Sequence, residues 1–208
     1  VVQHQLGLAR ALDCQRVICL ARGQSPELIS LQHSAEAAGM RFNIVLGLQQ
    51  MSSLVTASDE LIVITEGLVA EVGAVAPLLG GANSVVLSLP DDGAVAEGFE
   101  RLDINNAAAG LMRIPGSIVE RLHDLPGDCH TVSALTRIAL QSGAEMRQIP
   151  AEQRISMSWN MVRSESEAAA IERAWLRVRI TASSSNGLAD RGARIAVLSF
   201  GSSLLHAG

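Results

Sequence analysis

The sequence predicts an α/β protein with three layers, in which helices cover both faces of a mostly parallel sheet. Two observations lead to this fold class. Short apolar segments rich in Val, Ile and Leu recur along the first 150 residues, and segments with helical spacing separate them. Strands that alternate with helices form parallel sheets, because each connection crosses one face of the sheet. A length of 208 residues and a hydrophobic content of 48% are enough for a substantial core.

The first third of the chain contains three apolar strands and three helices. Ser25 and Pro26 are typical of a helix start, since Ser caps the first turn and Pro suits the first helical position. Gly39 is a typical helix terminator. We expect helices over 2–12, 25–39 and 47–56, and strands over 16–21, 41–46 and 60–65.

The middle of the chain continues the alternation. Gly80 and Gly81 should end one helix, and Pro90 should close the strand that follows. We expect helices near 71–79, 116–124 and 130–142, strands over 84–89 and 145–149, and weaker strands over 99–104, 109–114 and 155–158.

The composition of the sequence changes near residue 163. Acidic and Arg residues recur within a helical pattern that ends near Ala182, and the Ser-rich segment Ser183 to Gly187 is typical of a linker. We therefore divide the chain into an α/β domain over 1–162 and a helical linker with a basic amphipathic tail over 163–208. Two interpretations of the last segment, 183–208, stay open: it folds back on the domain, or it contacts a membrane or a partner.

The composition excludes several classes of chemistry. All 16 basic residues are Arg, because the chain contains no Lys. Walker-type phosphate loops, kinase-type lysines and Schiff-base enzymes all require Lys. Any phosphate group bound here must be held by Arg, by main-chain amides or by a metal ion. An excess of acidic residues over Arg in 1–150, with 2% aromatic content, argues against nucleic acid as a partner.

The three cysteines, Cys14, Cys19 and Cys129, have neither metal-site spacing nor an even count. A reducing, cytoplasmic setting therefore fits best. No charged and apolar leader precedes the first helix, and no apolar run reaches about 18 residues. The chain enters directly into a helix, whereas a doubly wound sheet opens with a strand. We therefore expect that the first βα unit is missing and that the sequence is a fragment.

The strand over 60–65 is followed by Glu66 and Gly67. Ligands of open α/β sheets sit outside the carboxyl ends of the strands, so Glu66 lies where a phosphate-bound metal ion is held in such folds. The sequence therefore makes Glu66 the first candidate for a metal ligand.

The order of "RVICLA", "RFNIVL" and "ELIVITEG", followed by "FERLDINNAAAGLMRIPGSIVERL", resembles the nucleotidyltransferase fold of sugar-phosphate and molybdenum-cofactor nucleotidyltransferases. The likeness covers about residues 1–150 and lies in layout more than in exact motifs. It implies a Rossmann-like sheet and a Mg²⁺ ion held at Glu66, where the family has Asp. The family's glycine-rich loop has no counterpart in this sequence.

The same resemblance implies a wall of the substrate site. Gly110 belongs to a segment similar to the family's "AG" strand, and Asp103, Asn105 and Asn106 come just before it. Small residues there would let a sugar or phosphate approach the main chain. A tight turn before a buried strand explains the same residues without a ligand.

An Arg-bearing helix and basic tail after an α/β domain also look like the N-terminal region of bacterial CDP-alcohol phosphatidyltransferase family proteins. That likeness implies attachment to a membrane enzyme, at the cytoplasmic face of the inner membrane. The family's own series of Asp residues on a membrane helix is absent from this sequence.

The remaining motifs are weaker. Residues 123–130 contain the possible metal ligands His123, Asp128, Cys129 and His130, but a loop capped by Asp128 or Thr131 explains them better. The sequence contains neither GxSxG nor GxGxxG.

Two functions remain as hypotheses. In the first, the domain uses Mg²⁺ to transfer a nucleotidyl group from a nucleotide such as CTP to a phosphorylated small alcohol or sugar. In the second, it is a catalytically inactive binding or regulatory module of a membrane enzyme.

Overall fold

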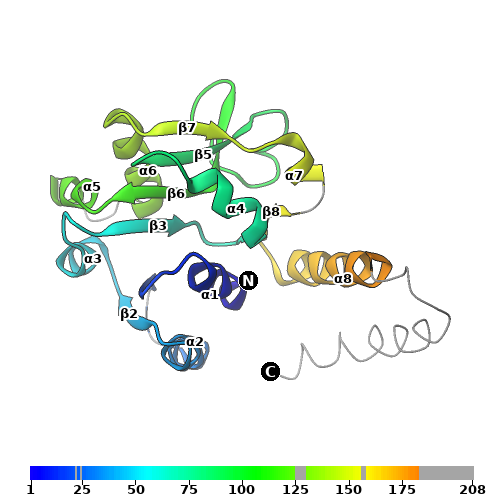
Figure 1. Cartoon of the computed structure of the whole chain (residues 1–208), viewed down its shortest axis with the longest axis horizontal. Helices are drawn as coiled ribbons and strands as arrows, with labels where there is room; N and C mark the ends of the chain where they lie inside the picture. Colours follow the sequence, from blue (N-terminus) through cyan, green and yellow to red (C-terminus); the bar gives the residue numbers. More distant parts are fainter. Residues whose placement is uncertain (22, 24, 125–129, 156–157, 183–208) are drawn as a thin grey trace. The chain divides into compact units, whose positions relative to one another are not determined.

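A computed structural model describes residues 1–21, 23, 25–124, 130–155 and 158–182. The chain divides into two compact units, Val1–Met161 and Val162–Gly208, and each is described by itself (Figure 1).

The largest sheet of the first unit has four strands in the order β3 (Glu60–Ile64), β6 (Asn106–Pro115), β5 (Val85–Pro90) and β7 (Glu145–Gln148). β5 runs parallel to β7, and β6 runs antiparallel to both of its neighbours. β3, β5 and β7 therefore point the same way, as expected for a mostly parallel sheet, and β6 is reversed.

Two smaller sheets complete the described strands. β1 (Arg16–Leu20) pairs in parallel with β2 (Arg41–Val45). β4 (Leu68–Ala70) pairs antiparallel with β8 (Trp159–Met161). Within the described residues neither pair joins the four-stranded sheet.

Helices follow the strands as the sequence pattern predicts. Ser25 caps α2 with its side-chain oxygen, which accepts from Leu28 N at 3.3 Å, and Pro26 occupies the first position. The helices of the first unit are α1 (Val2–Ala11), α2 (Pro26–Ala37), α3 (Leu48–Leu54), α4 (Val72–Leu79), α5 (Ser117–Glu120), the 3₁₀ turn η1 (Arg121–Asp124), α6 (Thr131–Gln141) and α7 (Ala151–Ile155).

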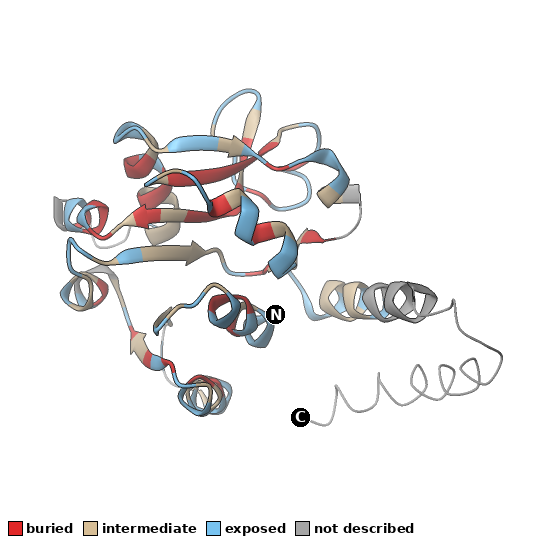
Figure 2. Cartoon of the chain, viewed as in Figure 1, coloured by how far each residue is buried: buried red, intermediate tan, exposed pale blue. Residues whose placement is uncertain are grey.

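Helices cover both faces of the four-stranded sheet. Val85, Leu87 and Leu89 of β5 belong to one buried cluster with residues of α1 and α4, whereas Val86 belongs to another with residues of α5 and α6. Successive side chains of a strand point to opposite faces, so these are the two sides of the sheet. Figure 2 shows the buried residues concentrated in β5 and β6. This confirms the expected α/β class and its three layers.

Two expected strands are wrong, and one short strand, β4, is not among the expected elements. Residues 99–104 form no strand apart from one isolated bridge between Arg101 and Ala107, because the Asp103 side chain holds the chain in a turn there. Ile155 ends helix α7, and the strand near it is β8. β4 has only three residues after a glycine, too few to produce a periodic signal in the sequence.

The second unit is described from 162 to 182 and contains α8 (Glu165–Ala182). Two hydrogen bonds cap the start of this helix, in an arrangement close to a capping box. Glu167 N donates to Ser164 Oγ at 3.2 Å, and Arg163 N donates to the Glu167 carboxylate at 2.7 Å. None of the helices in the described residues has the length and apolar character needed to cross a membrane. The expected basic tail over 183–208 lies outside the described residues.

Candidate functional site

Glu66 stands in a tight turn directly after β3. Leu68 N donates to Thr65 O at 3.2 Å, which closes a four-residue turn with Glu66 and Gly67 at its centre. Gly67 has φ 86°, the positive value that the third position of a type II turn requires and that glycine adopts without strain. Glu66 is exposed, and among the described residues its carboxylate has no hydrogen-bond or ion-pair partner. The turn therefore presents a free negative charge at the carboxyl end of β3.

Helix α1 bonds to this turn through Gln5 and to the end of the following strand, β4, through His4. Gln5 Nε2 donates to Thr65 O at 2.9 Å and to Leu68 O at 3.0 Å. His4 Nε2 lies 2.8 Å from Ala70 O. Two carbonyl oxygens that flank Glu66 are thus bonded by one side-chain amide, which limits the motion of the turn. Sequence reasoning missed Gln5 and His4, because nothing in the helical pattern of 2–12 shows which residue 60 positions later they meet.

Cys19 of β1 lies near the same turn. Burial raises the pKa of the Cys19 thiol, and the negative charge of Glu66 raises it further. The carboxyl ends of β1 and β3 therefore meet at one place, as expected for the ligand-binding edge of an α/β fold.

The loop before β6 is organised by Asp103. Its carboxylate accepts from Asn105 N at 2.7 Å and Asn106 N at 2.9 Å, and from the Asn106 side-chain amide at 3.0 and 3.1 Å. The main-chain N–H of Asn105 and the side chain of Asn106 hold the pKa of Asp103 below its ordinary value. In the structure Asp103 and Asn106 bond to each other and hold the loop in shape, as in the tight-turn interpretation.

Gly110 lies within β6, against the turn that carries Glu66. Thr65 N donates to Gly110 O at 2.8 Å. Gly110 has φ +79°, and a Cβ atom built on it would lie 3.3 Å from the Met161 methyl and 3.4 Å from Thr65 Cβ. The residue is therefore needed for close packing behind the Glu66 turn. Asn106 is four positions away from Gly110 along β6, roughly 14 Å.

The acidic residues at the end of β5 are neutralised. Asp91 forms an ion pair with Arg101 at 2.7 Å, and Asp92 forms one with Arg154 at 2.8 Å. The Asp92 hydrogen bond from Arg154 holds the pKa of this carboxyl below its ordinary value. Of the carboxylates that follow β3 and β5, Glu66 is thus the one available to a ligand in the described part of the chain.

Glu66 fits a Mg²⁺ ion that is mostly held by a ligand. Mg²⁺ in nucleotide sites is bound by one or two carboxylates together with substrate phosphates and water. The described residues contain no group of three or more His, Cys, Asp or Glu side chains able to hold a metal ion without such a ligand. Glu66 would therefore contribute one protein carboxylate.

The possible metal loop over 123–130 is described only in part. His130 is the N-cap of α6, where its Nδ1 accepts from Ser133 N at 3.5 Å and lies 2.9 Å from Ser133 Oγ. The cap is therefore neither Asp128 nor Thr131. Asp128, Cys129 and the side chain of His123 lie outside the described residues.

Two surface hollows of the described residues are lined by residues other than Glu66 and its turn. One is lined by Ser84, Ser117, Arg121 and Glu145, and the other by Arg16, Arg41 and Asn43. Both include the amino ends of parallel strands, the edge opposite the one where α/β folds bind ligands. We therefore place the candidate site at Glu66 on its chemistry and its position in the sheet.

Comparison with known proteins supports the fold. A protein from Bacillus anthracis, described as a glucose-1-phosphate thymidylyltransferase and solved in complex with sucrose, superposes with a TM-score of 0.53. The match covers 80% of this chain and 85% of that one, at 12% sequence identity. No family model and no curated protein matches the sequence. At this identity the likeness shows a shared nucleotidyltransferase-like fold.

Proposed function

We propose that the first unit binds a nucleotide at the Glu66 turn and transfers its nucleotidyl group to a phosphorylated sugar or small alcohol. One observation carries the proposal: the Glu66 carboxylate, which has no partner among the described residues, stands at the carboxyl end of β3 on a turn held by Gln5. The nucleotidyltransferase-like fold supports it, because this edge is where α/β folds bind ligands.

The reaction asks the protein mainly for positioning. A phosphate oxygen of the acceptor forms a bond to the α-phosphorus of the nucleotide, and pyrophosphate leaves with the electrons of the broken bond. Mg²⁺, when bound, neutralises negative charge on the phosphates. Glu66 would hold that ion, and since the chain has no Lys, the remaining positive charge must come from Arg and main-chain N–H groups. CTP as the nucleotide and attachment to a membrane phosphatidyltransferase belong to the same proposal.

A second candidate is a binding or regulatory module without catalysis. Two observations favour it. Glu66 is a single carboxylate, and the oxygens of Asp103 are already engaged by its own loop. Such a module would bind nucleotide and Mg²⁺ without releasing pyrophosphate.

Calorimetry and a pyrophosphate assay separate these functions. CTP and dTTP are titrated with and without Mg²⁺ into the protein and into Glu66→Gln, and pyrophosphate is measured with glucose 1-phosphate or a phospho-alcohol. We expect Mg²⁺-dependent binding that Glu66→Gln weakens at least about tenfold, the loss of one charged ligand. The control, Glu120→Gln, changes an exposed carboxylate on α5 and should bind like the wild type.

Nucleotide binding together with pyrophosphate release supports the transferase. Nucleotide binding without pyrophosphate release supports the binding or regulatory module. If the Glu66→Gln variant binds nucleotide with Mg²⁺ as tightly as the wild type does, the proposed role of Glu66 is wrong.

A further inference from the structure

Arg16 and Arg41 lie side by side at the starts of β1 and β2. The two strands pair in parallel, with Arg16 in register with Arg41. Neighbouring strands are about 4.8 Å apart, and registered residues of a parallel pair point to the same face of the sheet. The next registered pair agrees, since Val17 packs against the buried cluster that contains Phe42. The two arginines therefore share the opposite face with Asn43, which is two positions after Arg41.

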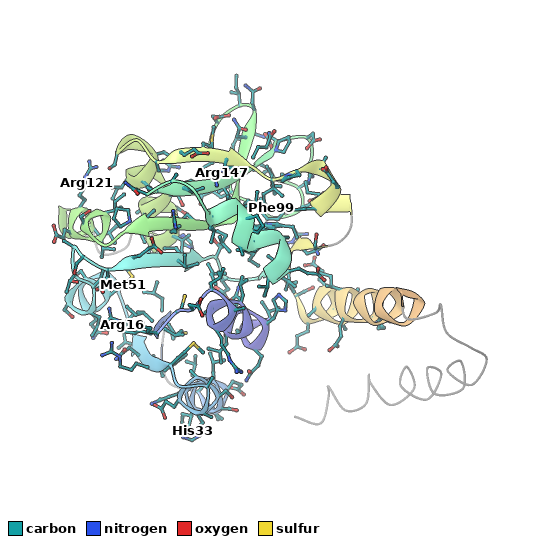
Figure 3. All side chains as sticks on the ribbon, viewed as in Figure 1. Arg16, His33, Met51, Phe99, Arg121 and Arg147 are labelled. Carbon is teal, nitrogen blue, oxygen red and sulfur yellow. The ribbon has the colours of Figure 1, made fainter. Side chains whose placement is uncertain are left out.

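Of the two arginines, Arg16 alone has an anionic partner in the described part of the chain. Its guanidinium forms an ion pair at 3.1 Å with Asp59 (Figure 3). The Asp59 carboxylate also accepts from Thr56 N at 2.8 Å and from the Thr56 hydroxyl at 3.0 Å. The Arg41 side chain is exposed and forms neither an ion pair nor a hydrogen bond with the described residues. Two neighbouring guanidinium groups repel each other, so one carboxylate leaves a positive charge unbalanced.

The Asn43 side chain adds two amide N–H donors on the same face. It is half-buried and has no hydrogen-bond partner among the described residues. A polar group that is partly removed from water without a partner costs stability. A ligand that accepts from this amide would recover that loss.

Arg16, Arg41 and Asn43 line one surface hollow of about 540 Å³. This volume lies in the range of small-molecule sites, about 300–1,000 Å³. Phe42 and Leu54 contribute to its lining. Glu36 does so as well, but its exposed carboxylate accepts from Gln32 Nε2 at 2.8 Å and makes no ion pair with the described arginines.

A phosphate group suits these donors better than a carboxylate does. Arginine binds phosphate oxygens through paired N–H groups. The three terminal oxygens of a phosphate monoester are tetrahedral and can accept from side chains on two strands, whereas a planar carboxylate matches one guanidinium best. The chain has no Lys, so arginine is the side chain that supplies a permanent positive charge to such a site.

We propose that this hollow binds the phosphate group of a small phosphorylated molecule through Arg41, Asn43 and the remaining N–H donors of Arg16. The hollow lies at the amino ends of β1 and β2, whereas Glu66 follows the carboxyl end of β3. β1 has five residues and spans about 16 Å, and Cys19 near its far end is the residue that senses Glu66. The bound phosphate is therefore separate from the nucleotide of the proposed function, and the proposal does not rest on nucleotidyl transfer.

NMR titration with sodium phosphate tests the site. The ¹⁵N-labelled protein is titrated without Mg²⁺, at an ionic strength held constant with sodium chloride. We expect saturable shifts of the Asn43 side-chain amide and the Arg41 Nε–H signal. Arg41→Met should weaken phosphate binding at least about tenfold, because a charged donor pair is lost. The control, Arg10→Met, removes an exposed arginine of α1 and should bind phosphate within about twofold of the wild type.

Asn43→Asp is a second test, in which no positive charge is lost. It places a carboxylate on the face shared by both arginines, within reach of their long side chains. That carboxylate should take the place of phosphate, so the variant should unfold at a higher temperature than the wild type in phosphate-free buffer. Added phosphate should raise the unfolding temperature of the wild type and leave that of Asn43→Asp unchanged.

Three outcomes overturn the proposal. Equal phosphate affinity of Arg41→Met and Arg10→Met would show that phosphate is attracted by general charge and not by the hollow. Sodium acetate that causes the same shifts at the same concentration would contradict the preference for phosphate. An unfolding temperature of Asn43→Asp that rises with phosphate as much as that of the wild type would show that Asn43 does not contact the ligand.

Discussion

Gln5 and Thr65, 60 residues apart in the chain, are joined by a hydrogen bond of 2.9 Å from the side-chain amide to the main-chain oxygen. Together with the bond to Leu68 O, it ties α1 to the turn that presents Glu66. Gln5→Ala should lower the free energy of unfolding by about 1–2 kcal/mol and weaken nucleotide binding, because the turn loses both bonds. Urea unfolding and calorimetry measure these effects. Gln3→Ala, an exposed change on the same helix, is the control, and equal losses in both variants would contradict the role of Gln5.

Gly116 should not tolerate a side chain. A Cβ atom there would overlap the carbonyl oxygen of Thr56, a main-chain atom that cannot move cheaply. Gly116→Ala should therefore destabilise the fold by about 2 kcal/mol or more. Gly7→Ala is the control, because a Cβ at Gly7 meets nothing within 4 Å and alanine favours helix α1 by about 1 kcal/mol. Thermal unfolding of the two variants should shift in opposite directions.

Asp59 should make stability depend on acid pH. The main-chain N–H of Thr56 and its hydroxyl, with Arg16, hold the pKa of Asp59 below its ordinary value. A lowered pKa in the folded state stabilises the protein above the unfolded pKa of about 3.9, and that stabilisation is lost as the pH falls through the folded pKa. Asp59→Asn should be less stable than the wild type near pH 6, with a difference that shrinks below about pH 4. A difference in urea midpoint that stays constant down to pH 2.5 would count against this reasoning.

Cys19 can report on Glu66. Burial raises the pKa of the Cys19 thiol most, and the charge of Glu66 raises it further. Glu66→Gln should therefore lower the pKa of Cys19 and speed its alkylation by iodoacetamide near pH 8, because more thiolate is present. The pKa of Cys14 is raised by burial, Asp13 and Glu60, so its rate should not change. Mass spectrometry of the separate peptides reads both rates in one sample.

Arg147 should matter more than a typical surface arginine. Its guanidinium donates to Gly80 O at 2.7 Å and to Leu78 O, and so bonds carbonyl groups at the end of α4 (Figure 3). Arg147→Met should cost about 1–2 kcal/mol in the free energy of unfolding, because those carbonyl groups lose a charged donor. Arg137→Met should cost less than about 0.5 kcal/mol, since Arg137 is 72% exposed and its ion pair with Glu100 is 3.9 Å long. Equal costs would show that Arg147 is not a helix cap.

Much of the fold could be predicted because its signals are local. The strand at Val85 is apolar apart from Ser88, and Ser25 with Pro26 marks the start of α2 by cap chemistry alone. β4 could not be predicted, because three residues after Gly67 are too few to show the alternation typical of a strand. Residues 99–104 contain the apolar residues Phe99, Leu102 and Ile104 and were expected to form a weak strand, but Asp103 bonds Asn105 and Asn106 and favours a turn.

The candidate site divides in the same way. The position of Glu66 after an apolar strand could be read from the sequence, and its free, exposed carboxylate is what the structure shows. The hydrogen bond from Gln5 to Thr65 O could not be predicted, because it depends on how helix α1 packs against a turn 60 residues later in the chain. The resemblance to the nucleotidyltransferase fold implied Asp103 and Asn106 as substrate-binding residues, and the structure shows their side chains bonded to each other.

By itself the sequence determined the class of fold, the succession of helices and strands, the absence of lysine chemistry and the location of Glu66, since each depends on residues close together in the chain or on composition alone. Tertiary structure decided which strands pair, that β6 runs against its neighbours and that β1 and β2 form a sheet separate from the four-stranded one within the described residues. The physical reason is that strand pairing and side-chain hydrogen bonds between distant segments depend on three-dimensional packing, which no local pattern encodes.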